Sequence, residues 1–267
     1  MIRPRKSLGQ HFLRDENIVR KILETVQPAA GETILEIGPG QGALTRHLAA
    51  APIHLVAVEV DERAVQILHE QLPPTVTLMQ GSILDVQLSE LSRYPAAAVR
   101  VIGNIPYNLT HDILFWLFDQ RTTVRDATLM VQLEVAQRLS AAPRTKAYGI
   151  LSVFTQFYTQ CHLLFKVART CFFPRPEVDS AVIQMTFRPS LPEVNEPLFR
   201  EVVRATFGKR RKTLRNGLKS MGLGDVVLNR LNVNLLRRPE ELTVDEFVQL
   251  SHLVETIRKE TTRVPGQ

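Results

Sequence analysis

The sequence has few cysteines and no long apolar run, and both shortages exclude classes of protein. Cys161 and Cys171 are the two cysteines among 267 residues. Their spacing fits no common metal motif, and so few thiols predict a reducing compartment. No apolar run approaches the roughly 20 residues that span a bilayer, and no apolar signal segment follows the basic residues near Met1. We therefore expect a cytoplasmic protein with no membrane contact and no metal site.

The composition is that of an ordinary globular protein with an excess of positive charge. Hydrophobic residues make up 44% and charged residues 22% of the chain, whose net charge is +6 and whose sequence pI is about 9.6. This length can bury one sizeable core and a smaller second one. The charge excess favours an anionic partner. Residues 190–267 carry 14 Lys and Arg against 10 Asp and Glu, so much of the excess lies in the last third.

A glycine turn follows the first predicted strand, 33–37, and precedes a predicted helix, 43–51. The turn reads Gly38-Pro-Gly-Gln-Gly, an arrangement typical of a nucleotide-binding α/β unit. Glycines let backbone amides approach a ligand without a Cβ in the way. The spacing is not that of a dinucleotide site, and Glu36 just before the turn would repel phosphate. It suits a ligand with a cationic end, although a purely structural turn remains the alternative.

Carboxylates follow the next two predicted strands. Glu59 lies at the end of strand 54–60, and Asp85 comes soon after strand 76–80. A carboxylate at the first position can accept both hydroxyls of a ribose, and one at the second can accept from an adenine amino group. Either acid alone could be a solvated loop residue. Together, at one edge of a sheet, they predict an adenosine site.

The fourth predicted strand, 98–102, leads into Gly103-Asn-Ile-Pro-Tyr107. Gly103 and Pro106 are predicted to break the strand, which would leave Asn104 and Tyr107 on a rigid turn at its carboxyl end. Pro106 also biases Ile105 towards an extended backbone with its carbonyl accessible. Two acceptors and an aromatic ring within four residues can grip a flat base that carries an amino group. An ordinary proline turn is the alternative.

Two segments in the second half also carry information. Phe172 and Phe173 stand in a stiff, proline-containing segment before the last predicted strand, 180–187, and at least one of two adjacent Phe is usually core. A proline-containing linker, 189–197, is predicted to separate a domain 1–189 from a helical domain 190–267. Residues 200–219 include eight basic residues and one acid, which predicts phosphate contacts rather than only a solvated face. The predicted RNA contacts are Lys209, Arg210, Arg211, Lys212 and Arg215.

Several of these motifs resemble known families. Glu36-x-Gly-x-Gly, Glu59, Asp85 and Asn104-Ile-Pro-Tyr resemble the class I S-adenosylmethionine-dependent methyltransferases that modify an amino nitrogen. Four further segments are similar to the ribosomal RNA adenine dimethyltransferases, most closely to the small-subunit enzymes among them: Ser-Leu-Gly-Gln-His-Phe-Leu (7–13), Lys-Ala-Tyr-Gly (146–149), Phe-Phe-Pro-Arg-Pro-Glu-Val-Asp-Ser-Ala (172–181) and Phe-Gly-Lys-Arg-Arg-Lys-Thr-Leu-Arg-Asn (207–216).

The resemblance implies a fold, a reaction and site residues. It implies an α/β, Rossmann-like methyltransferase sheet with helices on both faces, plus a small all-helical C-terminal domain. It also implies methyl transfer from S-adenosylmethionine to N6 of two adjacent adenines near the 3′ end of 16S rRNA, by a monomer acting on the small ribosomal subunit or its precursor. His11, Leu13 and Gly38 would line the methionine end of the cofactor, and Phe172 would form a wall of the base slot opposite Tyr107.

The same resemblance assigns the remaining roles. Asn104 and the Ile105 carbonyl would accept the amino protons of the target adenine, Glu59 would hold the ribose and Asp85 the adenine of the cofactor. The chain departs from the commoner pattern at Ile105, where leucine is more frequent, and at His11, where asparagine often stands. A 23S rRNA dimethyltransferase of the antibiotic-resistance type, a DNA adenine methyltransferase, a small-molecule methyltransferase and a mainly non-enzymatic ribosome-assembly factor are the alternatives.

Overall fold

The computed structural model describes residues 2–90, 99–208 and 212–262. By internal contacts the chain divides into two units. One unit consists of Met1–Ala136 and Thr159–Phe187, and the other of Gln137–Tyr158 and Arg188–Gln267. The second unit thus contains all of the predicted C-terminal domain, 190–267, and in addition residues 137–158 and 188–189. The division into a catalytic and an RNA-binding domain stays a prediction.

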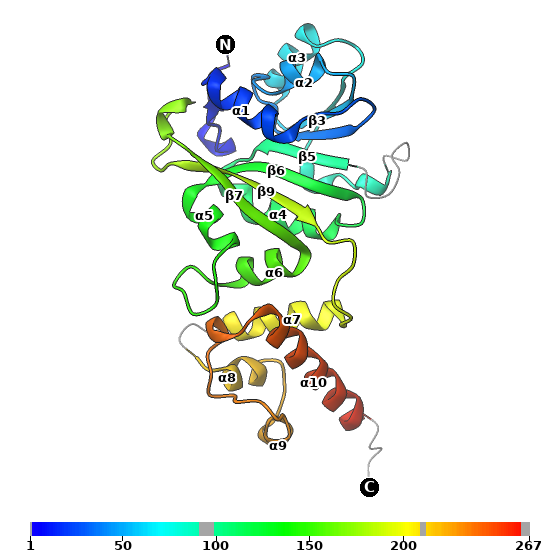
Figure 1. Cartoon of the computed structure of the whole chain (residues 1–267), viewed down its shortest axis with the longest axis vertical. Coiled ribbons are helices and arrows are strands. Elements are labelled where there is room, and N and C mark those ends of the chain that lie inside the picture. The colour runs from blue at the N-terminus through cyan, green and yellow to red at the C-terminus, as the bar shows by residue number, and fades with distance from the viewer. Residues whose placement is uncertain (1, 91–98, 209–211, 263–267) are drawn as a thin grey trace. The chain divides into compact units, whose positions relative to one another are not determined.

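The first unit is built on a sheet of seven strands within the described residues (Figure 1), in the order β4-β3-β2-β5-β6-β9-β7. The strands from β4 to β6 are parallel, and β9 runs antiparallel to both of its neighbours. The bounds are β2 (Thr33–Ile37), β3 (His54–Glu59), β4 (Thr77–Gln80), β5 (Val99–Asn104), β6 (Val124–Gln132), β7 (Thr159–Val167) and β9 (Ser180–Phe187).

Both faces of the central strands are buried, as the near-continuous apolar runs predict. Ile34 and Leu35 are neighbours that point to opposite faces of β2, yet they are 0% and 1% exposed. On the face of Ile34, helix α1 (Glu16–Val26) contributes Val19 and Ile22 to the hydrophobic core. The other helices of this unit are α2 (Thr45–Ala49), α3 (Glu62–Gln71), α4 (Thr110–Asp119) and α5 (Leu133–Leu139), the last of which spans the boundary with the second unit.

Gly103 does not end its strand, and the predicted break there was wrong. β5 continues through Asn104, which pairs with Met130 of β6. A Cβ on Gly103 would lie 2.7 Å from the backbone oxygen of Ile37, so this glycine permits a close approach between neighbouring strands. The extra strand residues fix the backbone of Asn104 in the sheet.

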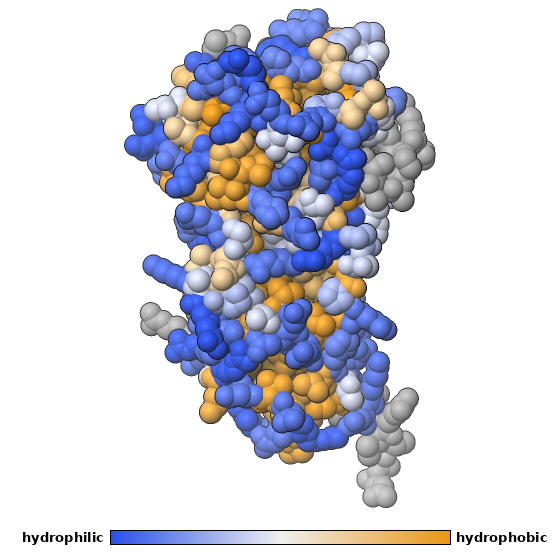
Figure 2. All heavy atoms as spheres, in the orientation of Figure 1, coloured by the Kyte–Doolittle hydropathy of each residue, from blue (hydrophilic) through white to orange (hydrophobic). Residues whose placement is uncertain are grey.

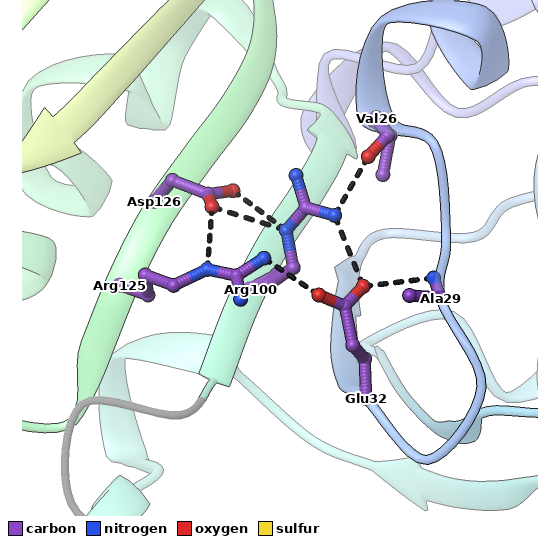
Figure 3. Close-up of polar contacts among 6 residues, drawn as sticks. All are labelled: Val26, Ala29, Glu32, Arg100, Arg125 and Asp126. Atoms are coloured by element: carbon purple, nitrogen blue, oxygen red, sulfur yellow. Dashed lines mark hydrogen bonds and ion pairs between the residues drawn. The ribbon is translucent and has the colours of Figure 1, made fainter.

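A cluster of ion pairs joins the amino ends of the parallel strands (Figure 3). The Arg100 guanidinium donates to Asp126, to Glu32 and to the backbone oxygen of Val26, and Arg125 bridges the same two carboxylates. Burial acts to raise the pKa of Glu32, but hydrogen bonds from the Ala29 amide and the two arginines outweigh it and hold that pKa at about 2. The cluster therefore contains two carboxylates and two guanidiniums in mutual contact.

The second unit is helical in the described residues. Besides α6 (Ile150–Tyr158) it contains α7 (Glu196–Phe207), α8 (Leu214–Lys219), α9 (Asp225–Asn229) and α10 (Val244–Thr262). Residues 150–158 belong here because Phe157 of α6 stacks on Phe199 of α7, with ring centroids 4.2 Å apart. α10 begins with a capping box, since Thr243 Oγ1 accepts from the Glu246 amide and Glu246 accepts from the Thr243 amide.

The surface is mostly hydrophilic on the face drawn in Figure 2, with smaller apolar areas between the polar side chains. Among the described residues, no helix is both long enough and apolar enough to cross a membrane. Two further strands of the first unit, β1 (Phe12–Leu13) and β8 (Phe172–Phe173), form a separate antiparallel pair. This pair attaches the amino-terminal segment to the segment before the last strand of the sheet.

Candidate active site

A cavity of about 260 Å³ lies at the carboxyl ends of β2, β3, β4 and β5. Most of its lining comes from five stretches of the first unit: residues 7–13, 36–41, 58–60, 81–83 and 104–109. Four of these follow or end parallel strands, and ligands of open α/β sheets bind at this edge. The cavity therefore brings together the glycine turn, Glu59 and Asn104, three features that the sequence placed at one site.

The glycine turn has the backbone that only glycine adopts readily. Gly38, Gly40 and Gly42 have φ angles of +64°, +56° and +81°. A Cβ on Gly40 would lie 3.0 Å from the ring of Phe12, whereas one on Gly38 would meet nothing within 4 Å. Gly40 thus allows the amino-terminal segment to pack closely, and Gly38 leaves open space beside the cavity, as its predicted role at the cofactor requires.

Two buried carboxyls border the cavity. Glu59 is 5% exposed, and its two oxygens accept the amides of Gly40 and Asp61, each at 2.9 Å. Burial raises the pKa of Glu59 despite these bonds. Glu36 is 2% exposed, and its Oε2 has no hydrogen-bond partner among the described residues. Burial, with a further contribution from the Glu59 charge, raises the pKa of Glu36 to about 8, while the neighbouring Thr45 hydroxyl acts in the opposite direction. A buried acceptor without a partner at a cavity suits a ligand that brings a donor or a positive charge.

Asp85 is the predicted ligand that does not line this cavity. It is exposed at the end of a short 3-10 helix, Ile83–Asp85. The lining residues from the same turn are Gly81, Ser82 and Ile83, which come directly after β4. Sequence reasoning missed Ser82 because it searched for an acid at this edge. The signal that could have found Ser82 is position, since it follows the end of β4 more closely than Asp85 does.

Asn104 is oriented by the amino-terminal segment. Its Nδ2 donates to the backbone oxygen of His11 at 2.7 Å, and among the described residues nothing donates to its Oδ1. This hydrogen bond fixes the amide and leaves its oxygen available to accept a hydrogen bond from a ligand. The Ile105 amide donates to Met130 of the neighbouring strand at 3.3 Å. Asn104 and Ile105 both line the cavity, so the two predicted acceptors lie together.

Tyr107 is held at its hydroxyl and covered on its ring. The hydroxyl lies 2.6 Å from Ser180 Oγ, and burial raises the pKa of the phenol. The His11 ring stacks on the Tyr107 ring with centroids 5.3 Å apart. His11 Nδ1 is 2.7 Å from the Pro174 carbonyl, and because a carbonyl only accepts, Nδ1 carries a proton here. His11 thus contacts both the asparagine turn and the aromatic segment, a position the sequence did not predict.

Phe172 and Phe173 have opposite environments. Phe172 is 5% exposed and packs in the hydrophobic core with Leu13, Ile102 and Val182, and it is not among the cavity-lining residues. Phe173 is 43% exposed. Adjacent residues of a strand point to opposite sides, so one ring of the pair is necessarily directed away from the core. The predicted role of Phe172 as a wall of a base slot stays a prediction.

The amino-terminal segment covers the cavity and is fixed at two places. Gln10 Nε2 donates to Asp61 at 2.9 Å, and β1 pairs with β8. The Arg63 guanidinium holds the pKa of Asp61 at about 2, so that this acceptor is ionised at neutral pH. Leu13, predicted to line the cofactor site, does line the cavity. Sequence reasoning missed Gln10 as an anchor, because the residue it contacts lies about 50 positions away.

The predicted RNA contacts lie in the second unit or outside the described residues. Lys209, Arg210 and Arg211 are among the residues that the structure does not describe. Lys212 is exposed. Arg215 donates to Asp225 and to Asn229, with a shortest distance of 2.7 Å to Asp225. Part of the positive charge in this stretch is therefore neutralised within the unit.

Comparison with known proteins identifies the family. The sequence profile of the ribosomal RNA adenine dimethylases matches residues 1–256. The chain belongs to this family. The chain is 42% identical to the ribosomal RNA small subunit methyltransferase A of Chlorobium phaeobacteroides, over 92% of each chain. It is 42% identical to the protein of that name from Geobacter sulfurreducens, over 94% of this chain and 95% of the other.

Solved structures confirm the predicted methyltransferase fold of this dimethylase family member. A dimethyladenosine transferase from Plasmodium falciparum superposes with a TM-score of 0.75 at 23% identity, covering 94% of this chain and 98% of the other. The 23S rRNA methyltransferase ErmE superposes with a TM-score of 0.66 at 25% identity, covering 91% and 99%. Both similarities extend over almost the whole chain, including the helical part that follows the sheet.

Proposed function

We propose that this chain transfers methyl groups from S-adenosylmethionine to N6 of two adjacent adenines near the 3′ end of 16S rRNA. The observation that carries the proposal is the Asn104 amide, which is anchored through Nδ2 to the His11 carbonyl and presents its oxygen beside the same cavity as Glu36 and Glu59. Membership of the dimethylase family and relatives at 42% identity that are named small-subunit methyltransferases support it.

The residues around the cavity suit S-adenosylmethionine. Its ammonium and sulfonium groups are cationic, and the unpartnered Glu36 oxygen is an acceptor at the cavity wall. Glu59, at the end of β3, would accept the ribose hydroxyls, and Gly38 leaves room for the methionine end together with His11 and Leu13. Asp85 is not among the lining residues of its turn, so Ser82 and Ile83 are the nearer candidates for the cofactor's adenine.

The chain prepares the amine of the target base. Bound S-adenosylmethionine supplies a methyl group on a positively charged sulfur, which is already electrophilic. The lone pair of adenine N6 is delocalised into the ring, so the amine is a poor nucleophile. Asn104 Oδ1 and the Ile105 carbonyl accept its two N–H groups, which favours a pyramidal nitrogen whose lone pair is localised. This is catalysis by positioning and electrostatics. As the N–C bond forms, the sulfur–methyl bond would break and leave S-adenosylhomocysteine, and one N6 proton is then lost to solvent.

The RNA would be held by both parts of the chain. Tyr107 would stack on the extruded adenine, with Phe172 as the second wall if the core around it opens. Exposed Lys212 and the neighbouring basic residues would contact phosphates of the small subunit or its precursor. We expect the protein to act there as a monomer in the cytoplasm.

The test is methylation of purified particles. The protein is incubated with small and, separately, large ribosomal subunits that lack the modification, together with methyl-labelled S-adenosylmethionine. We expect dimethyladenosine in a 3′ fragment of 16S rRNA by mass spectrometry and none in 23S rRNA. Label in 23S rRNA alone would identify an enzyme of the ErmE kind. Binding to small subunits without any label would identify an assembly factor.

A further inference from the structure

Phe173 leaves a large aromatic ring exposed at the edge of the candidate active site. Its 43% exposure contrasts with the 5% of Phe172 beside it. A single exposed apolar residue is normal on a protein surface. The surroundings of this one are not, because a guanidinium lies over the ring and the strand partner of Phe173, Phe12, lines the site.

The Phe173 ring and the Arg14 guanidinium stack on each other, and the two side chains together are called the platform below. The guanidinium carbon of Arg14 lies 4.0 Å from the centroid of the Phe173 ring. The backbone beneath is fixed, since Phe173 pairs with Phe12 in the β1–β8 sheet and the Arg14 amide donates to the Cys171 carbonyl at 2.9 Å. Bases of single-stranded RNA stack on aromatic rings and on arginine planes, and here the two surfaces come together.

The platform is joined to the residues proposed to grip the target adenine. Pro174, directly after Phe173, accepts the His11 Nδ1–H at 2.7 Å. His11 in turn stacks on Tyr107, and its carbonyl anchors Asn104. Pro174 and His11 therefore connect the exposed Phe173 ring to the turn that carries Asn104 and Tyr107. In enzymes that act on extruded bases, contacts to the flanking nucleotides help to set substrate choice.

The segment that carries the ring is held in shape and is accompanied by positive charge. The Arg169 amide donates to Asp179 at 2.9 Å, and the Arg169 guanidinium donates to the Glu177 carbonyl at 3.1 Å. These bonds close the loop between β7 and β9. Arg175, two residues after Phe173, is exposed. A preformed loop with an exposed ring and exposed guanidiniums suits a nucleotide better than an apolar partner.

We propose that Phe173, with Arg14 over its ring, is a stacking platform for the base of a nucleotide adjacent to the target adenine in single-stranded RNA. The proposal rests on the function proposed above and adds a contact with the flanking nucleotide. It assigns Phe173 to substrate binding rather than to the chemical step. Loss of the ring therefore weakens RNA binding while the orientation of the target amine is kept.

The experiment compares four full-length variants on small ribosomal subunits with unmethylated 16S rRNA. Phe173→Leu keeps an apolar side chain without a ring, Phe173→Ala removes the side chain beyond Cβ, and Phe173→Tyr keeps an aromatic ring. Val178→Ala is the matched control, because Val178 is 45% exposed in the same segment. The measurements are KM for the particles, kcat, the Kd for S-adenosylmethionine and the melting temperature.

We expect Phe173→Leu and Phe173→Ala to raise the particle KM about fivefold to a hundredfold, the range that loss of one base–aromatic stack gives. In both variants kcat should stay within about twofold of the parent value, and the Kd for S-adenosylmethionine should be unchanged. Phe173→Tyr and Val178→Ala should match the parent chain.

Two results would overturn the platform. One is an unchanged particle KM in the Leu and Ala variants. The other is a fall in kcat at constant KM, which would make Phe173 a wall of the target-base slot. A parent chain that methylates no RNA would instead overturn the proposed function, so the two failures are distinguishable. If Phe173→Ala lowers the melting temperature, Phe173→Leu and Phe173→Tyr still decide the outcome.

Discussion

Among the described residues, buried ionisable groups are paired at the amino ends of the parallel strands, and two buried glutamates lack an opposite charge at the carboxyl ends of the same strands. At the amino ends, Arg100, Asp126 and Glu32 are buried or nearly so, and every charge in the cluster has an opposite partner (Figure 3). At the carboxyl ends, Glu36 and Glu59 are buried side by side without a cation, and one Glu36 oxygen has no hydrogen-bond partner among the described residues.

The difference indicates how stability and function are divided along the sheet. A buried charge that is paired and hydrogen-bonded is compatible with a stable fold, whereas an unpaired one shifts its pKa and destabilises the fold. The paired end therefore stabilises the sheet, and the unpaired end retains an acceptor for a ligand. Substitutions at the amino ends should therefore change the free energy of unfolding, and substitutions at the carboxyl ends should change catalysis or ligand binding.

The largest effect is expected at the paired end. Arg100→Met leaves two buried carboxylates without their shared cation, so we expect a loss of roughly 3–5 kcal/mol in the free energy of unfolding. Arg125→Met is the matched control, because the Arg125 side chain is 46% exposed and should contribute less than about 1 kcal/mol. Urea denaturation measures both. Equal losses in the two variants would contradict the special role of the buried arginine.

The next effect concerns catalysis at the unpaired end. Asn104→Ala removes one acceptor for the target amine, so kcat should fall by about 10²- to 10³-fold, as for the loss of a single aligned polar group in other active sites. Unfolding should change little. Asn17→Ala, on the exposed face of α1, is the control and should keep full activity. Single-turnover methylation of small subunits gives the rate. A variant with an unaltered rate would remove Asn104 from the mechanism.

The smallest effect is expected in the pH dependence of folding stability and of ligand affinity, both of which depend on Glu36. The pKa of Glu36 is about 8 in the fold and near 4.5 in the unfolded chain, so between these values the folded state holds the extra proton. Stability therefore falls as the pH rises from about 4.5 to 8. We expect Glu36→Gln to remove this slope and to be more stable than the parent at pH 8.

The same substitution should weaken the binding of a cationic donor. At pH 8 we expect Glu36→Gln to bind S-adenosylmethionine about tenfold more weakly, because a charge-assisted contact is lost. Parent affinity should increase with pH, and that of the variant should not. Glu24→Gln, exposed on α1, should change neither stability nor affinity. Thermal unfolding and calorimetric titration at pH 6 and pH 8 make the test. Parallel pH profiles for parent and variant would contradict it.

Much of the sheet could be predicted because local apolar runs determine it. Strands 33–37 and 180–187 have the predicted bounds, and the acids and glycines that follow the first strands fall at one edge. A strand pattern fixes which residues lie at its end, and parallel strands bring those ends together. The position of the cavity at this edge follows from these facts, whereas the methyltransferase fold class was implied by the family resemblance.

What could not be predicted depends on contacts between distant segments. The bonds of His11 to Asn104 and Pro174 join residues about 90 and 160 positions apart. The opposite environments of Phe172 and Phe173 follow from a two-residue strand that is too short to give a periodic signal. Asp85 was expected at the cavity from its residue type, whereas the turn after β4 presents Ser82 and Ile83 instead.

The attachment of the first residues has a practical consequence for anyone who purifies the protein. Ile2 accepts a hydrogen bond from Gln41 at 3.2 Å, and the Arg3 carbonyl accepts one from Arg63 at 3.1 Å. An affinity tag fused ahead of Met1 would thus place foreign residues next to the glycine turn. Kinetic work is better done with a cleavable tag at the other end, and enzyme tagged at the amino end should be compared with untagged enzyme before any variant is interpreted.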